Sequence, residues 1–301
     1  MSTTDNNTKG YLALAATSII WGSTWVGSRY AVQFVPGLQI SSIRQFLAGS
    51  VLLAFYLIKG EKLPTWQQFK WLALVAFLII ALNNGLGTWS VKYISSGLAA
   101  LIAALYPICT VLLEMLFFKK TNNTPLTFVG LLVGIGGVAF VFYENAFQAQ
   151  PPGYAFGVAL SITGMLGWSL GTIFIARNKH SMNPYYATGW QMIIASAMIF
   201  ALSRATGNHI PIAAIPSNVW ITMAYLVIVG SVLTFVAFVY SVKHLPAAIA
   251  SLYAYINPIV AMLVGAWWLH EKLTVNLLIG SVITIAGVYI VNYSLRRRKA
   301  K

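Results

Sequence analysis

The chain has few charged residues and very few acidic ones. Only 8% of its 301 residues are charged, and Asp and Glu together number 5. A soluble domain carries about 25% charged residues, so the charges here cannot cover a water-exposed surface. The one cysteine, Cys109, excludes an intrachain disulfide and a thiolate metal cluster.

The sequence patterns of enzymes are also missing. The chain has no HExxH motif, no phosphate-binding loop, no Ser/His/Asp set and no pair of carboxylates within an apolar run. We therefore predict that the protein is not an enzyme and that it holds no metal and no cofactor.

Apolar residues dominate what remains. They make up 58% of the chain, and the mean hydropathy is +0.76. Apolar runs of about 20 residues, each long enough to cross the hydrocarbon core of a bilayer, follow one another with short polar breaks. The short alternating strands of a membrane barrel do not occur. The sequence predicts an all-α integral membrane protein with ten transmembrane helices, near residues 11–31, 37–58, 69–90, 94–118, 125–143, 154–176, 184–203, 218–241, 246–270 and 274–295.

A net charge of +14 would suit nucleic acid, but the positions of the cations favour another explanation. With the N-terminus inside, the inner loops and ends hold 14 Lys and Arg residues, and the outer segments hold 4. Such a bias is typical of the cytoplasmic side of inner-membrane proteins. We predict a multi-pass protein of the cell inner membrane with both termini in the cytoplasm. Its surroundings are the lipid bilayer, and no nucleic acid partner is expected.

The sequence repeats itself over a long period. Residues 90–112 align without a gap to residues 241–263. Identical residues at matched positions include Ser90 and Ser241, Lys92 and Lys243, and Pro107 and Pro258. Each half has five spans, an odd number, so the second half enters the membrane from the opposite side. We predict two inverted five-helix repeats, at residues 1–146 and 151–301, an arrangement that gives a transporter two gates around one central site.

Two prolines lie at matched positions near the centres of the fourth and ninth spans. Pro107 and Pro258 each remove a helical hydrogen bond and free a carbonyl group. Paired interruptions in corresponding spans point to a transport site, although prolines in membrane helices can also serve packing alone. Their repetition favours function, so we interpret both as helix breaks at a substrate site. Polar side chains beside them are expected to bind substrate: Tyr106, Tyr253, Tyr255 and Asn257.

Further candidates for substrate binding lie at depth in other spans. Trp21 and Trp168 are near mid-depth, where an indole N–H needs a partner or a wet cavity. A bond to a neighbouring backbone carbonyl explains them equally well. Arg44, Asn83 and Gln191 cost free energy unless they face a cavity or the bundle interior. Arg44 either binds an anionic substrate group or extends to the outer surface, and we favour an interior partner.

The fifth and tenth spans are rich in glycine. Gly130 and Gly134 have the spacing of a small-residue packing motif, and Gly280 and Gly287 lie in the tenth span. We expect these two spans to pack helices together, within the chain or in a homodimer, and not to line the site.

Taken together, these segments resemble the EamA-type transporters of the drug/metabolite transporter superfamily, over almost the whole chain. The order and spacing of the segments carry the resemblance: Trp21-Gly22-Ser23, Arg44 through Ala48, the Ala-rich span that ends in Pro107, Trp168 through Gly171, the Asn257-Pro258 span, His270 through Thr274, and Gly280 through Gly287. The resemblance implies two inverted five-helix repeats around a central cavity, often with export as the direction. This chain departs from the family after the fourth span, where Lys119-Lys120 replaces a Glu followed by Arg or Lys.

We predict a secondary transporter that moves small polar or amphipathic metabolites, such as amino acids, across the inner membrane. It would work by alternating access, with export as the expected direction. Two alternatives stay open. The first is uptake or exchange of a phosphorylated or nucleotide-linked metabolite, with Arg44 as the anion clamp. The second is an integral-membrane enzyme that acts on lipids, which would need clustered acids or histidines, whereas the 4 histidines here are scattered over loops and helix ends.

Overall fold

The computed structural model describes residues 3–118, 124–146, 150–177, 182–245, 247–250 and 252–299, and these residues form helices and turns without any strand. Six spans are single helices: α1 (Thr3–Ala31), α2 (Gly37–Ile58), α7 (Pro125–Ala146), α8 (Tyr154–Arg177), α9 (Pro184–Ala205) and α14 (Val275–Lys299). Four are composite: α3 (Trp66–Val75) with η1 (Ala76–Leu86) and α4 (Gly87–Ser90); α5 (Ser96–Ala103) with α6 (Tyr106–Phe118); α10 (Ser217–Ala224) with η3 (Tyr225–Leu233) and α11 (Thr234–His244); and α12 (Ala247–Ala250) with α13 (Tyr253–Leu269). A short 3-10 turn, η2 (Ile212–Ala214), precedes α10.

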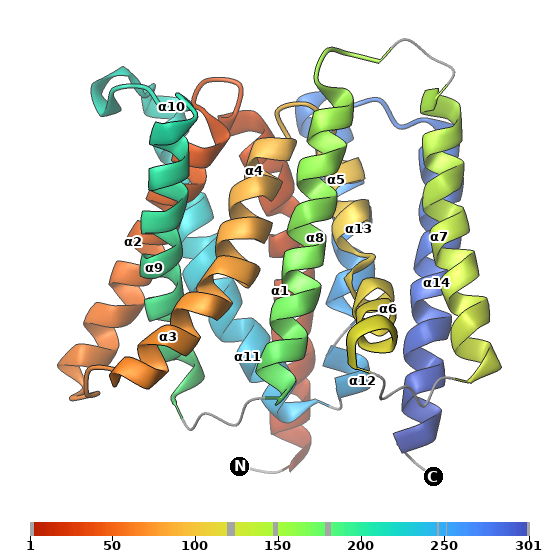
Figure 1. Ribbon diagram of the computed structural model, residues 1–301, viewed down its shortest axis with the longest axis horizontal. Coiled ribbons are helices and arrows are strands. Elements are labelled where there is room, and N and C mark those ends of the chain that lie inside the picture. Colours follow the sequence, from red (N-terminus) through yellow and green to blue (C-terminus); the bar gives the residue numbers. More distant parts are fainter. Residues whose placement is uncertain are drawn as a thin grey trace.

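The predicted all-helical membrane fold is confirmed. Within the described residues, 8 helical segments are long and apolar enough to cross a bilayer, and α13 is a shorter apolar helix. With α1 they make up the ten spans that the sequence predicts. Figure 1 shows them as one bundle, in which α1 begins and α14 ends on the same side.

Short polar motifs set where several helices begin. Thr65 and Gln68 form a reciprocal cap at α3, in which Gln68 N donates to Thr65 Oγ1 (3.3 Å) and Thr65 N donates to Gln68 Oε1 (2.8 Å). At the start of α5, Leu98 N donates to Ser95 Oγ (3.2 Å). The first N–H groups of a helix lack intrahelical partners, so these side chains fix ends that the apolar pattern alone leaves undefined.

The third and eighth spans each contain a long π-helical stretch at a similar depth. η1 lies in the third span and η3 in the eighth. At the end of η3, Ser231 Oγ donates to Leu226 O, five residues back (3.0 Å). A π-helix is rare, is mostly a single turn and frequently marks a functional site. The residue pattern does not predict it, because hydrophobic periodicity does not separate α from π geometry over two or three turns.

The fourth and ninth spans are interrupted near the paired prolines, but the breaks precede both prolines. The fourth span leaves helical geometry at Ala104 and Leu105, so Pro107 is the second residue of α6. A proline there costs little, because first-turn N–H groups have no helical partner. In the ninth span α12 ends at residue 250 and α13 begins at residue 253, while Pro258 lies inside α13. The interpretation of Pro107 and Pro258 as the breaks themselves is corrected accordingly.

Helices α7 and α14 pack on each other through glycines, at one edge of the bundle (Figure 1). A Cβ placed on Gly137 would lie 2.5 Å from Thr284 N, and one on Gly130 would lie 2.7 Å from Val291 N. The two backbones are therefore in direct contact, which only glycine allows. The fifth and tenth spans do pack within the chain, and a homodimer stays a prediction.

Most contacts between spans join the first half of the chain to the second. α1 packs on α11 and α13, α2 on α9, η1 and α6 on α8, and α7 on α14. Suppose that spans one to five correspond in order to spans six to ten. The contact of α1 with α13 (spans one and nine) then corresponds to the contact of α8 with α6 (spans six and four). The contact of α1 with α11 (spans one and eight) corresponds to the contact of α8 with η1 (spans six and three). The second–seventh and fifth–tenth pairs correspond to themselves, so the contact pattern is the one that a twofold relation between the halves would produce.

A polar network joins three spans where α5 begins and α13 ends. The carboxylate of Glu271 accepts hydrogen bonds from Ser96 N (2.9 Å) and Ser96 Oγ (2.6 Å), and it lies 3.5 Å from Arg29 Nε. It therefore caps α5 and ties that helix to α1 and to the loop after α13. This explains Glu271 as a structural residue at one end of the bundle.

Candidate functional site

A cavity of about 200 Å³ lies in the interior of the bundle. A water molecule needs about 10–15 Å³ of such space, so the cavity has room for a small organic molecule. Among the described residues, its lining comes from every span except α7 and α14. Both π-helical stretches and both interrupted spans contribute to it.

Aromatic rings form much of the wall. Trp21, Phe238 and Tyr253 pack on one another, with ring centroids 5.1 Å apart for Trp21 and Phe238 and 5.3 Å apart for the other two pairs. Trp21 Nε1 donates to Gly230 O in η3 (3.2 Å). The indole of Trp21 thus both lines the cavity and donates a hydrogen bond to a backbone carbonyl. Both explanations that the sequence leaves open for Trp21 therefore apply.

A second aromatic pair lies at the break in the fourth span. The rings of Tyr106 and Trp168 have centroids 6.4 Å apart and meet edge to face. The carbonyl of Tyr106 accepts hydrogen bonds from Ser169 Oγ (3.1 Å) and Thr110 Oγ1 (2.7 Å). The backbone at the break is therefore satisfied by side chains of α6 and α8, as a buried carbonyl requires.

Arg44 is the one cation among the described residues that line the cavity. Its side chain is only 7% exposed. Nε donates to Ser231 Oγ (2.9 Å), and Nη2 lies 3.5 Å from Gly230 O, at the limit of a hydrogen bond. Both partners are neutral, and no Asp or Glu is among the described lining residues. The guanidinium thus faces the interior, as predicted, and its charge is not neutralised there by a carboxylate.

Amide side chains supply most of the remaining polarity. Asn83, Asn84 and Gln191 line the cavity together with Gln45 and Asn257. The carbonyl oxygens Gln45 Oε1 and Asn257 Oδ1 are buried and have no hydrogen-bond partner within the described part of the chain. Buried acceptors are normally satisfied, so these two oxygens are exceptions that call for an explanation.

Eight of the nine residues predicted to bind substrate line this one cavity: Trp21, Arg44, Asn83, Tyr106, Trp168, Gln191, Tyr253 and Asn257. Tyr255 does not. Its ring packs with Ile108 and Val288, and its hydroxyl lies 3.5 Å from Val288 O and also meets Asn292 Nδ2. Tyr253 and Asn257 are four residues apart and share a helix face, whereas Tyr255 points to the opposite face.

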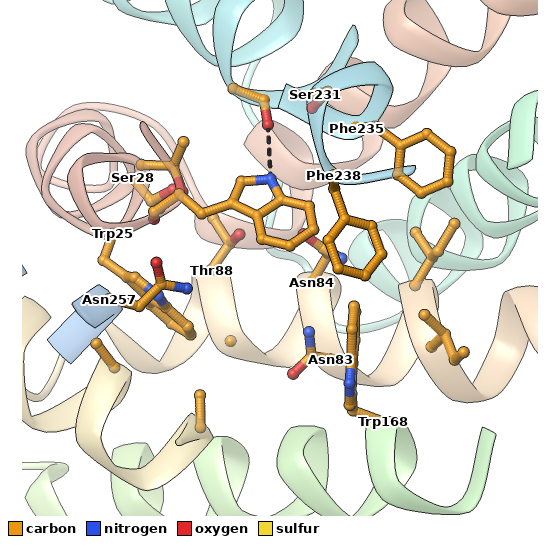
Figure 2. Close-up of a pocket in the computed structure, with 18 of the residues that line it drawn as sticks. Trp25, Ser28, Asn83, Asn84, Thr88, Trp168, Ser231, Phe235, Phe238 and Asn257 are labelled. Atoms are coloured by element: carbon orange, nitrogen blue, oxygen red, sulfur yellow. Dashed lines mark hydrogen bonds between the residues drawn. The ribbon is translucent and has the colours of Figure 1, made fainter. Parts of the chain in front are cut away.

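The sequence analysis missed several lining residues. In α1 the lining continues from Trp21 through Thr24, Trp25 and Ser28. Residues at that spacing share one face of a helix. Helical periodicity counted from Trp21 could therefore have predicted these lining residues. In the eighth span the missed residues are Gly230, Ser231, Phe235 and Phe238. Figure 2 shows Phe235 and Phe238 across the cavity from Trp25 and Asn257.

A multi-span helical bundle around a central, partly polar cavity is an arrangement typical of membrane transporters. Comparison with known proteins agrees with that class. The chain belongs to the EamA-like transporter family, which matches residues 8–143 and again residues 155–293.

Individual relatives align with nearly the full length of the chain. The uncharacterized inner membrane transporter YedA of Escherichia coli (strain K12) is 31% identical over 281 residues, which cover 92% of this chain and 89% of the relative. The uncharacterized transporter YoaV of Bacillus subtilis (strain 168) is 23% identical over 301 residues, which cover 97% and 99%. One solved crystal structure matches with a TM-score of 0.63 at 16% identity, over 98% of this chain and 99% of that one. At that identity the match shows the fold alone.

Proposed function

We propose that the protein is a secondary transporter that moves small polar or amphipathic metabolites across the inner membrane by alternating access, with export as the direction. The observation that carries the proposal is the central cavity, which combines aromatic walls with unpaired polar groups. Ligand sites are mostly apolar hollows with a few placed polar groups. A bundle that needed only to be stable would fill this space with apolar side chains.

The mechanism rests on two related halves, residues 1–146 and 151–301. The family match falls once in each half, and the span contacts pair across the halves in a twofold pattern. In an inverted repeat, any opening toward one side of the membrane has a counterpart toward the other side, related to it by a pseudo-twofold rotation. The two interrupted spans, α5–α6 and α12–α13, are the elements that would flex, because i→i−3 turn bonds occur between their helices, from Leu105 N to Ile102 O (3.1 Å) and from Leu252 N to Ile249 O (2.9 Å).

The orientation of the proposed transporter follows from its cations. The 14 to 4 distribution of Lys and Arg favours both termini in the cytoplasm. The first turn of α1 and the last turn of α14 lie on the same side of the bundle (Figure 1), which agrees with a common side for the termini.

A phosphorylated or nucleotide-linked substrate is a weaker candidate. Arg44 favours an anion, but a phosphate monoester carries about −1.5 to −2 charges at neutral pH. One guanidinium, which already bonds to Ser231, does not match that charge. A lipid-directed enzyme is also disfavoured, since the described residues contain no group of three or more His, Cys, Asp or Glu side chains.

Metabolite profiling tests the proposal and does not require a substrate to be chosen in advance. Cells that express the chain are compared with cells that express a variant in which Tyr253 and Trp168 are both replaced by Ala, at equal amounts of membrane-inserted protein. An exporter lowers a small set of metabolites inside the cell and raises the same set outside. Identical profiles from the two cultures would overturn the proposal.

A further inference from the structure

The charge of the central cavity is unbalanced. Arg44 is its one cation among the described lining residues, and none of those residues is acidic. The described carboxylates lie elsewhere: Glu271 caps α5, Glu61 is near Asn183 in a loop, and Glu114 is in α6 outside the lining. A cation within a membrane span is costly, so a guanidinium without a carboxylate partner needs a reason.

The guanidinium is held in place but is not saturated. Its five N–H donors form a planar fork suited to a carboxylate. Only the bond from Nε to Ser231 Oγ is short, at 2.9 Å, and the contact of Nη2 with Gly230 O is long, at 3.5 Å. Ser231 is itself fixed, because its hydroxyl donates to Leu226 O (3.0 Å) within the π-helical stretch. The arrangement orients the fork and leaves donors for a second partner.

Two amide residues that line the cavity also have unpaired buried acceptors. Gln45 Oε1 and Asn257 Oδ1 are buried without a hydrogen-bond partner among the described residues. Gln45 follows Arg44 in α2 and is 2% exposed, and Asn257 comes from α13. An amide carbonyl accepts N–H donors, and a buried one left unpaired is destabilising. The aromatic walls complete the site with surface for an apolar body.

We infer that Arg44 makes the cavity selective for organic molecules with a single carboxylate, and that Gln45 and Asn257 accept hydrogen bonds from an N–H group of the same molecule. Organic cations without a carboxylate are excluded by repulsion from Arg44. This inference rests on the transport function proposed above, and it assigns a charge preference to the same cavity.

Three probes with one carbon skeleton separate the contributions. L-leucine has both a carboxylate and an ammonium group, 4-methylpentanoate lacks the ammonium group, and L-leucinamide lacks the carboxylate and is largely cationic at pH 7. Binding is measured by calorimetry on the purified full-length chain in detergent micelles. We expect L-leucine to bind more tightly than 4-methylpentanoate, and L-leucinamide to bind weakest. The dissociation constants of L-leucine and L-leucinamide should differ by about tenfold or more, the equivalent of about 1.4 kcal/mol.

Variants assign the preference to Arg44. Arg44→Gln should abolish the preference for L-leucine over L-leucinamide, and Arg44→Lys should weaken it, since lysine keeps the charge but not the fork. Arg204→Gln is the matched control, because Arg204 lies exposed in the last turn of α9. If Arg44→Gln does not fold, Ser231→Ala, which removes the orienting oxygen, should still reduce the preference.

The outcomes distinguish the two proposals. Equal binding of L-leucinamide and L-leucine, retention of the preference in Arg44→Gln, or no binding of any carboxylate probe would overturn the charge selectivity and leave the transport proposal standing. Carboxylate binding that needs Arg44, in a protein whose expression leaves every metabolite level unchanged, would uphold the selectivity and overturn transport.

Discussion

Single side chains in this bundle divide into those that face the cavity and those that hold helices together, often within one turn of each other. Tyr253 and Tyr255 illustrate this on α13. The sequence groups them, because both are aromatic, polar and close to Pro258. The structure separates them, because residues two apart on a helix point to different faces. Polar residues within the apolar spans thus predicted most of the residues that line the cavity. They did not predict which face of a helix each residue occupies, because a break in the span shifts the helical periodicity.

Replacement of these two tyrosines should have different effects. Tyr253→Ala removes a ring from the cavity wall, so transport per folded molecule should fall severalfold. Tyr255→Ala leaves a void between α13 and α14, which for a large buried ring costs about 3–5 kcal/mol. That variant should lower the amount and thermal stability of folded protein, while the molecules that fold transport normally. The check is metabolite export normalised to monodisperse protein; equal losses in both variants would place both residues in one role.

At the scale of helical elements, the glycine contacts and the π-helical stretches differ in how far sequence predicts them. Glycines four residues apart predict close packing, and the predicted pair, Gly130 and Gly134, does lie in the contact of α7 with Gly287 of α14. The π-helical geometry of η1 and η3 has no comparable signal, because it depends on hydrogen bonds shifted by one residue. Asn83 in η1 and Ser231 in η3 both line the cavity.

Neighbouring glycines in α7 offer a test of the packing. A Cβ on Gly137 would lie 2.5 Å from Thr284 N, whereas a Cβ on Gly136 has nothing within 4 Å. Gly137→Val should therefore force α7 and α14 apart and destabilise the protein by about 1–3 kcal/mol. Gly136→Val should leave the melting temperature in detergent within experimental scatter. A similar loss in both variants would mean that helix propensity, not contact, sets the effect.

The proline inside α13 is a second test at this scale. Pro258 has no N–H to donate to the carbonyl of Ala254, which lines the cavity. Pro258→Ala restores that hydrogen bond and should stiffen the element, so export should fall by more than the amount of folded protein falls. Pro107→Ala should act more weakly, since Pro107 already lies in the first turn of α6. Export that merely tracks folded protein in both variants would show that the prolines serve packing.

At the scale of the whole molecule, composition and charge bias were enough to predict an all-helical membrane bundle with ten spans. The internal repeat further predicted which span of the first half corresponds to which span of the second half. The interleaving of the halves could not be predicted, because it depends on which apolar faces meet, and in a membrane chain nearly every face is apolar. Both α2 and α13 are apolar helices, for example, yet α2 packs on α9 and α13 packs on α1.

The orientation of the molecule can be measured with reporter fusions. A reporter fused after Lys301 should be active only as a cytoplasmic protein, and one inserted within residues 144–153 only as an exported protein, because five spans separate the connector from the N-terminus. A fusion at the exposed Lys59–Gly60 turn provides an inner-side control. An exported C-terminus would remove the basis for an inverted relation between the halves.

Access to the cavity from both sides of the membrane is the most direct test of the proposed transporter. Single cysteines are introduced at Ser28 and at Thr188, which line the cavity from α1 and α9, in a chain with Cys109→Ser. A membrane-impermeant thiol reagent is applied to intact cells and to inside-out vesicles. Alternating access predicts that each cysteine is labelled from either side, more slowly than a cysteine placed at the exposed Gly60 is labelled in inside-out vesicles. Labelling from one side only, or protection from both, would contradict it.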